Sequence, residues 1–358
     1  RFVNNKWGTF GSLGAGWVLS NEAFLESSTW LDFLKLKTSY GVIGDQAGVG
    51  FYPGYDIFNI VNVDGNPAFS FDKKGNPDLS WERSQMFQVG AEFEIGNWLS
   101  GNIEYYLKNT DKLIFERRIG PSIGYSLINV NDGNLRNQGL EFDFTGHLLK
   151  GKNYYVDLTV NGESFKNKIT KMPIDPTTGQ QKPLDIQTYY GWSVGHSIYD
   201  FYVPEYIGVD PEDGRSQWTS YYLDKNSNGV LDPKEEIVSF GSYENPDNLE
   251  VLKTSTKSYS QATQLYSGKS AIPKLRGSIN LRAGYRNFDF SVQLLYSIGG
   301  YAYDAAYAIL MGNGTVGGNN WHKDIYQRWQ KEGDQTDVPR ISNNAGTDLN
   351  VNSKSTRF

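Results

Sequence analysis

The chain has 358 residues, of which 38% are hydrophobic, and a formal net charge of −6 that comes from interspersed acidic and basic residues. Its mean hydropathy is −0.53, and no stretch approaches the roughly 18 to 20 consecutive apolar residues of a membrane-spanning helix, which excludes helical membrane insertion. The even spread of charge argues against nucleic acid as a partner, and the lack of cysteine excludes disulfides, thiolate catalysis and cysteine-bound zinc.

Residues that favour strands and turns dominate the composition. The chain contains 24 Tyr, 19 Phe, 9 Trp and 39 Gly, a mixture typical of many strands joined by turns. The sequence begins directly in patterned residues, without the features of a signal peptide. We therefore expect a β-rich protein whose signal was removed or whose true N-terminus lies upstream.

Alternation of apolar and polar or small residues predicts strands from the start of the chain. Residues 13–19 and 34–42 both show a period of two, which places successive side chains on opposite faces of a strand. Three predicted hairpins follow, at residues 85–108, 140–161 and 275–296, with turns at Gly96-Asn97, residues 150–153 and Arg286-Asn287. In each hairpin one face is apolar and the other is polar or charged.

Long polar connections distinguish two interpretations of this pattern. A soluble β-sandwich would also alternate, so we keep a soluble or surface carbohydrate-binding or adhesin-like module as the alternative. However, the turns at one end of the hairpins are short, and aromatic residues lie near the strand ends. The segments at the other end are long: 44–78, 166–194, 209–271 and 303–342. This asymmetry is typical of outer-membrane barrels, and it predicts an all-β, antiparallel transmembrane β-barrel fragment with long extracellular loops.

One loop fits the twelve-position calcium motif. Its oxygen-bearing positions and the carbonyl at position seven are Asp224, Asn226, Asn228, Val230, Asp232 and Glu235, and Gly229 occupies the sixth position, where the loop turns sharply. Asp, Asn and Gly also favour turns for backbone reasons alone, so an Asx-rich turn is the competing interpretation. We expect no required cofactor, and at most a Ca²⁺ ion that stiffens a surface loop.

Catalytic patterns are weak, and we expect no enzyme. His147 lies in register with polar strand residues, and Glu92 and Glu94 share one face of a strand, where carboxylates ordinarily line water rather than form a glycosidase pair. An aromatic group could stack on sugar rings, pack on peptides or belong to an aromatic girdle. It comprises Tyr189, Tyr190, Trp192, Tyr199, Phe201 and Tyr202.

Several segments, in order, resemble the barrel of SusC/RagA-type TonB-dependent outer-membrane transporters. Residues 10–24 resemble the family's "FPS…GW…E.F" segment, 34–41 its "LKLR.SYG" strand, 76–82 its "NP.L.WE" motif and 137–141 its "N.G.E" strand start. Recurring loop motifs of the family resemble residues 207–214, 328–330 and 339–340.

The resemblance implies that residues 1–358 are part of one large plugged barrel in the outer membrane of a Gram-negative bacterium. It implies that the N-terminal plug, the segment that contacts TonB and the C-terminal closing strands are absent from this chain. It also implies TonB-driven import of a bulky glycan or oligopeptide, with outer-membrane lipid around the barrel and a SusD-like surface lipoprotein as a lid.

Overall fold

The computed structural model describes residues 2–118, 127–175, 177–233, 235, 237–238, 249–312, 320–342 and 354–358. These residues form two compact units. The first comprises 1–182, 193–198 and 272–300, and the second comprises 183–192, 199–271 and 301–358, within the described ranges. We call them the wall unit and the loop unit, and each is described by itself.

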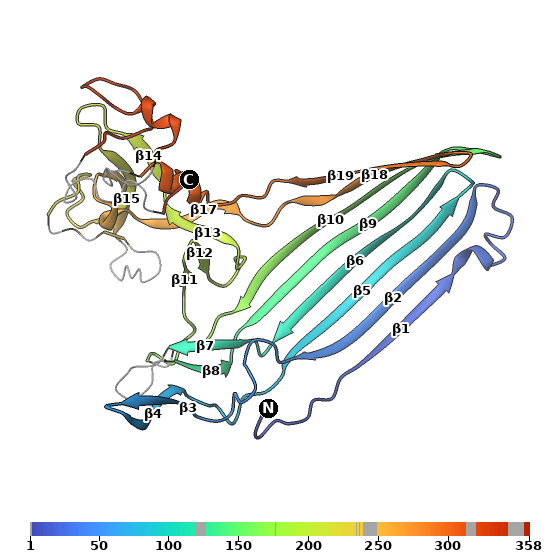
Figure 1. Cartoon of the computed structure of the whole chain (residues 1–358), viewed down its shortest axis with the longest axis horizontal. Coiled ribbons are helices and arrows are strands. Elements are labelled where there is room, and N and C mark those ends of the chain that lie inside the picture. Colours follow the sequence, from blue (N-terminus) through green and yellow to red (C-terminus); the bar gives the residue numbers. More distant parts are fainter. Residues whose placement is uncertain are drawn as a thin grey trace. The chain divides into compact units, whose positions relative to one another are not determined.

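The wall unit is built on one antiparallel sheet of eight strands (Figure 1). Each strand is hydrogen-bonded to the sheet strand before it along the chain, in the up-and-down order expected for a barrel wall. The strands are β1 (Gly11–Val18), β2 (Leu31–Asp45), β5 (Glu82–Ile95), β6 (Leu99–Asp111), β9 (Asn134–Gly151), β10 (Tyr154–Lys171), β18 (Leu275–Tyr285) and β19 (Phe288–Ile298).

The three predicted hairpins are confirmed. β5 pairs with β6, β9 with β10 and β18 with β19, each through a connection of two or three residues. Gly96 and Arg286 adopt positive φ in two of these turns, at 50° and 52°. Irregularities in this pairing were not predicted: the register of β9 and β10 shifts beside Val156, where a bulge leaves Leu148 without a paired residue, and again between Ile169 and Lys171.

The long connections of the wall unit have structure of their own. Residues 44–78, expected to be an outward loop, contain the hairpin of β3 (Ile57–Val63) and β4 (Asn66–Lys73), and a second hairpin, β7 (Ile114–Arg118) with β8 (Leu127–Asn131), follows β6. A small apolar cluster of Phe2, Val49 and Leu79 lies beneath these segments, with Trp81 and Ile114 packed against it.

The loop unit contains two small sheets, although we expected most of its residues to form irregular loops. β11 (Asp185–Gln187), β12 (Tyr190–Trp192), β13 (Asp200–Pro204) and β17 (Gln264–Ser270) form one sheet, and β14 (Tyr206–Val209), β15 (Ser216–Asp224) and β16 (Glu250–Thr256) form the other.

Short helices complete the described chain. The α-helix α1 (Ala305–Leu310) and the 3-10 helices η3 (Tyr259–Gln261) and η4 (Lys323–Gln327) belong to the loop unit, and the 3-10 helix η1 (Leu19–Asn21) to the wall unit. In the loop unit, Met311, Ile325 and Val338 form a buried apolar cluster. Within the described residues, no helix is long and apolar enough to cross a membrane.

Candidate functional site: a two-faced wall and a structured loop unit

The first face of the wall sheet is apolar and exposed. Side chains at alternate positions of every strand project from it, as the hairpin pattern requires, and they remain open to the surroundings. Leu13 is 81% exposed and Leu294 is 61% exposed, values that a soluble core face would not show. Members of this band include Leu13, Leu36, Phe87, Val89, Tyr105, Leu140, Ile279, Leu281, Phe290 and Leu294.

Charged groups end the apolar band toward the long connections. Arg83 lies on the same face as Phe87 and Val89, and its guanidinium pairs with the Asp111 carboxylate opposite it on β6 at 2.5 Å. Beside this pair, Arg136 donates to the Asn109 side chain at 2.7 Å. We call these four residues the polar belt. Because charged side chains are costly within hydrocarbon, the belt marks the upper edge of a lipid-facing surface.

Aromatic side chains mark the opposite edge of the same band. They lie at or beside the connections at the short-turn end of the sheet, and each is about half exposed or more. This arrangement confirms the expected aromatic residues at strand ends and matches the interfacial girdle of a transmembrane barrel. The aromatic edge comprises Trp17, Trp30, Trp98, Tyr154, Tyr285 and Phe288.

The second face of the sheet is polar and crossed by ion pairs. Lys37 on β2 bridges Glu92 on β5 at 2.8 Å and Glu104 on β6, and Arg276 on β18 pairs with Glu163 on β10 at 2.6 Å. Glu92 therefore lines a charged wall, as expected, rather than a converging catalytic pair.

A row of glutamates crosses the middle of this face. Glu104, Glu141 and Glu163 are directly opposite one another on β6, β9 and β10, and the Tyr106 hydroxyl donates to Glu163 at 3.1 Å. A hollow of about 780 Å³ adjoins the row. Like charges at opposed positions destabilise a dry sheet, so the row indicates a hydrated inner face.

His147 is a polar strand side chain, as the sequence predicted. Its Nδ1 atom lies 2.8 Å from the Asp157 carboxylate across the β9–β10 pair, and its Nε2 atom lies 3.5 Å from the Ser100 hydroxyl. These contacts make it a polar side chain of the inner wall.

Asp132 joins two of the long connections of the wall unit, and no motif in the sequence predicts this contact. Its carboxylate, only 7% exposed, accepts from Arg117 at 2.9 Å, Lys171 at 3.2 Å and the Ile174 N–H at 2.6 Å. Burial alone would raise the pKa of Asp132, but these donors hold the pKa below its ordinary value. Asp132 thus fastens the β7–β8 hairpin to the end of β10.

The motif at residues 76–82 clasps the same hairpin. Ser80 exchanges two hydrogen bonds with the Asn131 side chain, at 2.6 and 2.8 Å, and Glu82 accepts from the Ile114 N–H at 2.8 Å. In this chain the motif therefore helps to order the long connections where they leave the wall.

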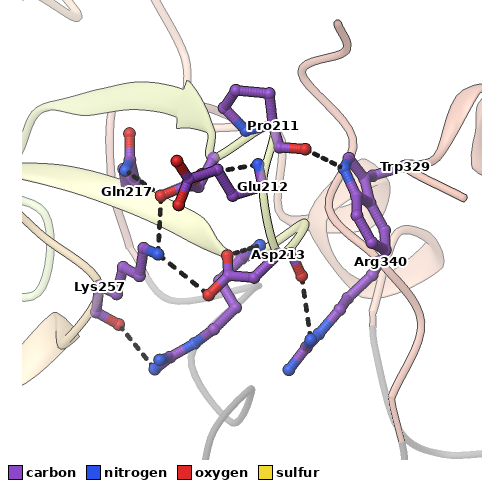
Figure 2. A network of polar contacts seen from close by, with 9 residues as sticks. Pro211, Glu212, Asp213, Gln217, Lys257, Trp329 and Arg340 are labelled. Carbon is purple, nitrogen blue, oxygen red and sulfur yellow. Dashed lines mark hydrogen bonds and ion pairs between the residues drawn. The ribbon is translucent and has the colours of Figure 1, made fainter. Parts of the chain in front are cut away.

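In the loop unit, two sequence motifs that are far apart in the chain meet (Figure 2). The turn at residues 210–215 offers its backbone oxygens to the segment 329–340. The Pro211 carbonyl accepts from the Trp329 indole at 3.0 Å, and the Asp213 carbonyl accepts from Arg340 at 2.9 Å.

Ion pairs with a lysine also hold this turn. Lys257 on the segment after β16 pairs with Asp210 at 2.7 Å and Asp213 at 2.9 Å. The hydrogen bond from Lys257 to Asp210 raises the pKa of Lys257 and lowers the pKa of Asp210. The Asp210 carboxylate also accepts from the Glu212 N–H. We call the contacts among residues 210–215, Lys257, Trp329 and Arg340 the loop latch.

Several rings of the tyrosine-rich segment pack against other aromatic rings of the loop unit. The rings of Tyr189 and Tyr303 stack at 4.4 Å, Tyr190 contacts Phe201 at 5.0 Å, and Tyr202 contacts Tyr266 at 4.9 Å. Burial raises the pKa of Tyr202 to about 12. Phe201 and Tyr202 are buried, whereas Tyr199 is 42% exposed. The interpretation of this group as sugar- or peptide-stacking residues or as part of a girdle stays a prediction.

In the calcium-like loop, side-chain oxygens accept hydrogen bonds from N–H groups of the same loop. The Asp224 carboxylate accepts from the backbone of Asn228 and Gly229 at 3.2 and 2.8 Å, and Asp232 accepts from the side-chain amides of Asn226 and Asn228 at 2.6 and 2.9 Å. Glu235 accepts from the Asp232 N–H at 2.9 Å, and Val230 is exposed.

These contacts bring the predicted ligands of the loop together. Among the described residues, however, no three His, Asp or Glu side chains are grouped so as to hold a metal. Calcium binding would therefore depend on the Asn226 and Asn228 oxygens and the Val230 carbonyl, and it stays a prediction.

Comparison with known proteins agrees with a barrel wall. The sequence model described as "TonB dependent receptor-like, beta-barrel" matches residues 1–330. The chain is 26% identical over 321 residues to the TonB-dependent receptor SusC of Bacteroides thetaiotaomicron, covering 84% of this chain and 28% of SusC. It is 26% identical over 351 residues to the TonB-dependent receptor P3 of Formosa agariphila, covering 94% of this chain and 32% of that protein.

Solved structures share the fold. The structure of the RagAB peptide transporter matches with a TM-score of 0.78 at 24% identity, over 98% of this chain and 36% of that chain. The RagAB peptide importer in the "open-open" state matches with a TM-score of 0.75 at 25% identity, over 98% of this chain and 35% of that chain. The chain thus spans about a third of the length of the relatives it matches.

Proposed function

Because the chain belongs to the TonB-dependent receptor-like β-barrel family, we propose that the whole protein imports a bulky nutrient across the outer membrane of a Gram-negative bacterium. The observation that carries the proposal is the two-faced wall. An exposed apolar face bounded by the polar belt and the aromatic edge suits lipid, and the opposite face of ion pairs suits a hydrated lumen.

The relatives support transport rather than catalysis. They are named as receptors and transporters, in agreement with the expectation that the chain is not an enzyme. The inner wall offers many charged and hydrogen-bonding groups along neighbouring strands, which fits passage of a hydrated cargo.

Energy and a lid would come from other components. We propose that the plug and the TonB-contacting segment belong to the rest of the protein, and that TonB drives import. The likeness to SusC and to the RagAB peptide transporter supports a SusD-like surface lipoprotein as the lid and a glycan or oligopeptide as the cargo.

Uptake by the producing bacterium tests the proposal. Deletion of the gene for the whole protein should slow growth on either oligopeptides or one class of glycan as the sole nutrient source, and loss of TonB should reproduce that defect. The protein should also remain in the outer-membrane fraction and migrate differently on gels before and after heating. Unchanged growth on every oligopeptide and glycan tested would count against import, and a detergent-independent soluble species would count against the barrel.

A further inference from the structure

One connection at the short-turn end of the wall is much longer than the others. Two or three residues join β5 to β6, β9 to β10 and β18 to β19, but residues 19–30 join β1 to β2. Figure 1 shows this connection at the same end of the sheet as the short turns. Because two residues are enough to reverse an antiparallel pair, the extra length serves another purpose. We call it the 19–30 segment.

Part of the backbone of the 19–30 segment forms hydrogen bonds within the segment. It contains η1 and continues in helical turns, with the Leu25 N–H donating to the Glu22 carbonyl at 2.8 Å and the Ser28 N–H to the Leu25 carbonyl at 2.9 Å. Amides that are paired within the segment lose little when they enter a poorly hydrated environment.

The side chains of the 19–30 segment are both apolar and polar, and the largest apolar ones are unburied. Phe24 is 66% exposed and Trp30 is 61% exposed, whereas Glu26 and Ser27 supply exposed polar groups. Large aromatic side chains beside polar ones favour the interface between a membrane and water.

Two hydrogen bonds fix the segment to the aromatic edge. The Trp17 indole at the end of β1 donates to the Glu22 carboxylate at 2.8 Å. At the other end, the Trp30 carbonyl accepts from the Gly96 N–H in the β5–β6 turn at 3.1 Å. The segment is therefore held at the level of Trp17 and Trp98, where the apolar band ends.

We propose that the 19–30 segment is an interfacial anchor that places Phe24 and Trp30 in the boundary between headgroups and acyl chains of the periplasmic leaflet. Its occupant is phospholipid, because Trp30 belongs to the aromatic edge at which the lipid-facing band of β1 and β2 ends, and the exposed Phe24 lies in the same segment. The segment carries Glu22 and Glu26 but no basic residue, so apolar contact rather than attraction to anionic headgroups would hold it there.

Depth measurement on single cysteine variants tests the anchor. The chain has no cysteine, so Phe24→Cys introduces a unique site for a spin label in a cysteine-free form of the whole protein. Glu26→Cys is the matched control in the same segment, and Val89→Cys reports the lipid-facing band. Each variant would be reconstituted in phosphatidylethanolamine and phosphatidylglycerol vesicles, and heat-modifiable migration would verify its fold. The ratio of oxygen to nickel-chelate accessibility then measures depth.

The anchor predicts an ordered set of depths. The ratio at Phe24→Cys should lie above that at Glu26→Cys and below that at Val89→Cys, and it should be unchanged by high salt. Equal, aqueous ratios at positions 24 and 26 would overturn the proposal. Protection of position 24 in native outer-membrane vesicles but not in pure lipid would also overturn it, because a periplasmic protein would then be the occupant.

Discussion

Single residues decide whether the loop latch can close, and Gly214 is the tightest of them. It adopts a φ of +72°, and a Cβ at this position would lie 2.4 Å from the Trp329 ring. We predict that Gly214→Ala destabilises the latch by about 1–3 kcal/mol, from backbone strain and displacement of the indole. Hydrogen exchange of residues 329–340 should report the loss as faster exchange.

Gly229 offers a matched control for this experiment. Its φ of +75° carries the same backbone strain, but the space around it is open. Gly229→Ala should therefore leave exchange in residues 329–340 unchanged. If Gly214→Ala also left it unchanged, contact between the turn and Trp329 would not hold the two motifs together.

Asp132 yields a prediction about charge and pH. Asp132→Asn removes the charge shared by Arg117, Lys171 and the Ile174 N–H, and it should cost about 1.5–3 kcal/mol of local stability. Faster hydrogen exchange in residues 127–131 and 171–175 would reveal it. Asp64→Asn is the control, because Asp64 occupies an exposed turn at a φ of 51° that Asn adopts equally well.

The pH dependence of this contact has a definite sign. The pKa of Asp132 is lowered in the folded protein, so its contribution is fully present above the ordinary value of 3.8 and is lost as the pH falls below that value. Protection of residues 171–175, corrected for intrinsic exchange, should thus decline below about pH 4 in the natural protein. An equal decline in Asp132→Asn would assign the effect to another group.

At the scale of elements, the calcium-like loop provides the third prediction. The Asp224 and Asp232 carboxylates each accept hydrogen bonds from other residues of the loop, and a bound cation would replace these donors. We expect Ca²⁺ to bind and to displace Tb³⁺, whose luminescence the adjacent Tyr222 would sensitise. Asp224→Ala should abolish the signal and Asp210→Asn should preserve it. A signal that survives Asp224→Ala would contradict calcium binding by this loop and favour its interpretation as an Asx-rich turn.

Strand periodicity explains which elements the sequence revealed. In β5, the order Phe87, Val89, Ala91 and Phe93 identifies one face without knowledge of the partner strand, so the wall hairpins were predictable. β15 has no such signal because nearly all of it is buried on both faces, with Trp218 on one face and Thr219 on the other. A strand enclosed on both sides loses its alternation, and the loop unit was therefore interpreted as irregular loops.

The polar belt shows a different limit. Arg83 follows the phase of the apolar side chains on β5, and in the sequence it simply interrupts a pattern. Its meaning depends on Asp111 lying opposite it on β6, a pairing that only the register supplies. Asp132 was missed for a similar reason, because its donors come from two separate parts of the chain, Arg117 on β7 and residues 171–174 at and after the end of β10.

The edge of the lipid-facing band can be tested on one strand. Val89 lies within the apolar band of β5, and Gln85 lies on the same face at the polar belt. Val89→Arg should cost about 2–4 kcal/mol of folding free energy in a bilayer, whereas Gln85→Arg should cost about 0–1 kcal/mol. Denaturant unfolding in vesicles, read from the heat-modifiable band, would compare them. Equal costs would place both positions outside the hydrocarbon.

At the scale of the whole molecule, the wall sheet is open. β1 and β19 are the first and last strands of the eight, and among the described residues they pair with β2 and β18 but not with each other. Two unpaired edges and an exposed apolar face are unfavourable both in lipid, where backbone groups need partners, and in water, where the apolar face drives association.

The isolated 358-residue chain should therefore not refold to a monomeric barrel, whereas the whole protein should. Refolded into detergent micelles, it should give aggregates or edge-paired oligomers and no heat-modifiable monomer, because closing strands would be needed to satisfy the edges of β1 and β19. Light scattering and unheated gels would separate these states, with the whole protein as the positive control. A monomeric, protease-resistant product from the chain alone would mean that its two edges find partners within the chain, and the wall would then be a small closed barrel.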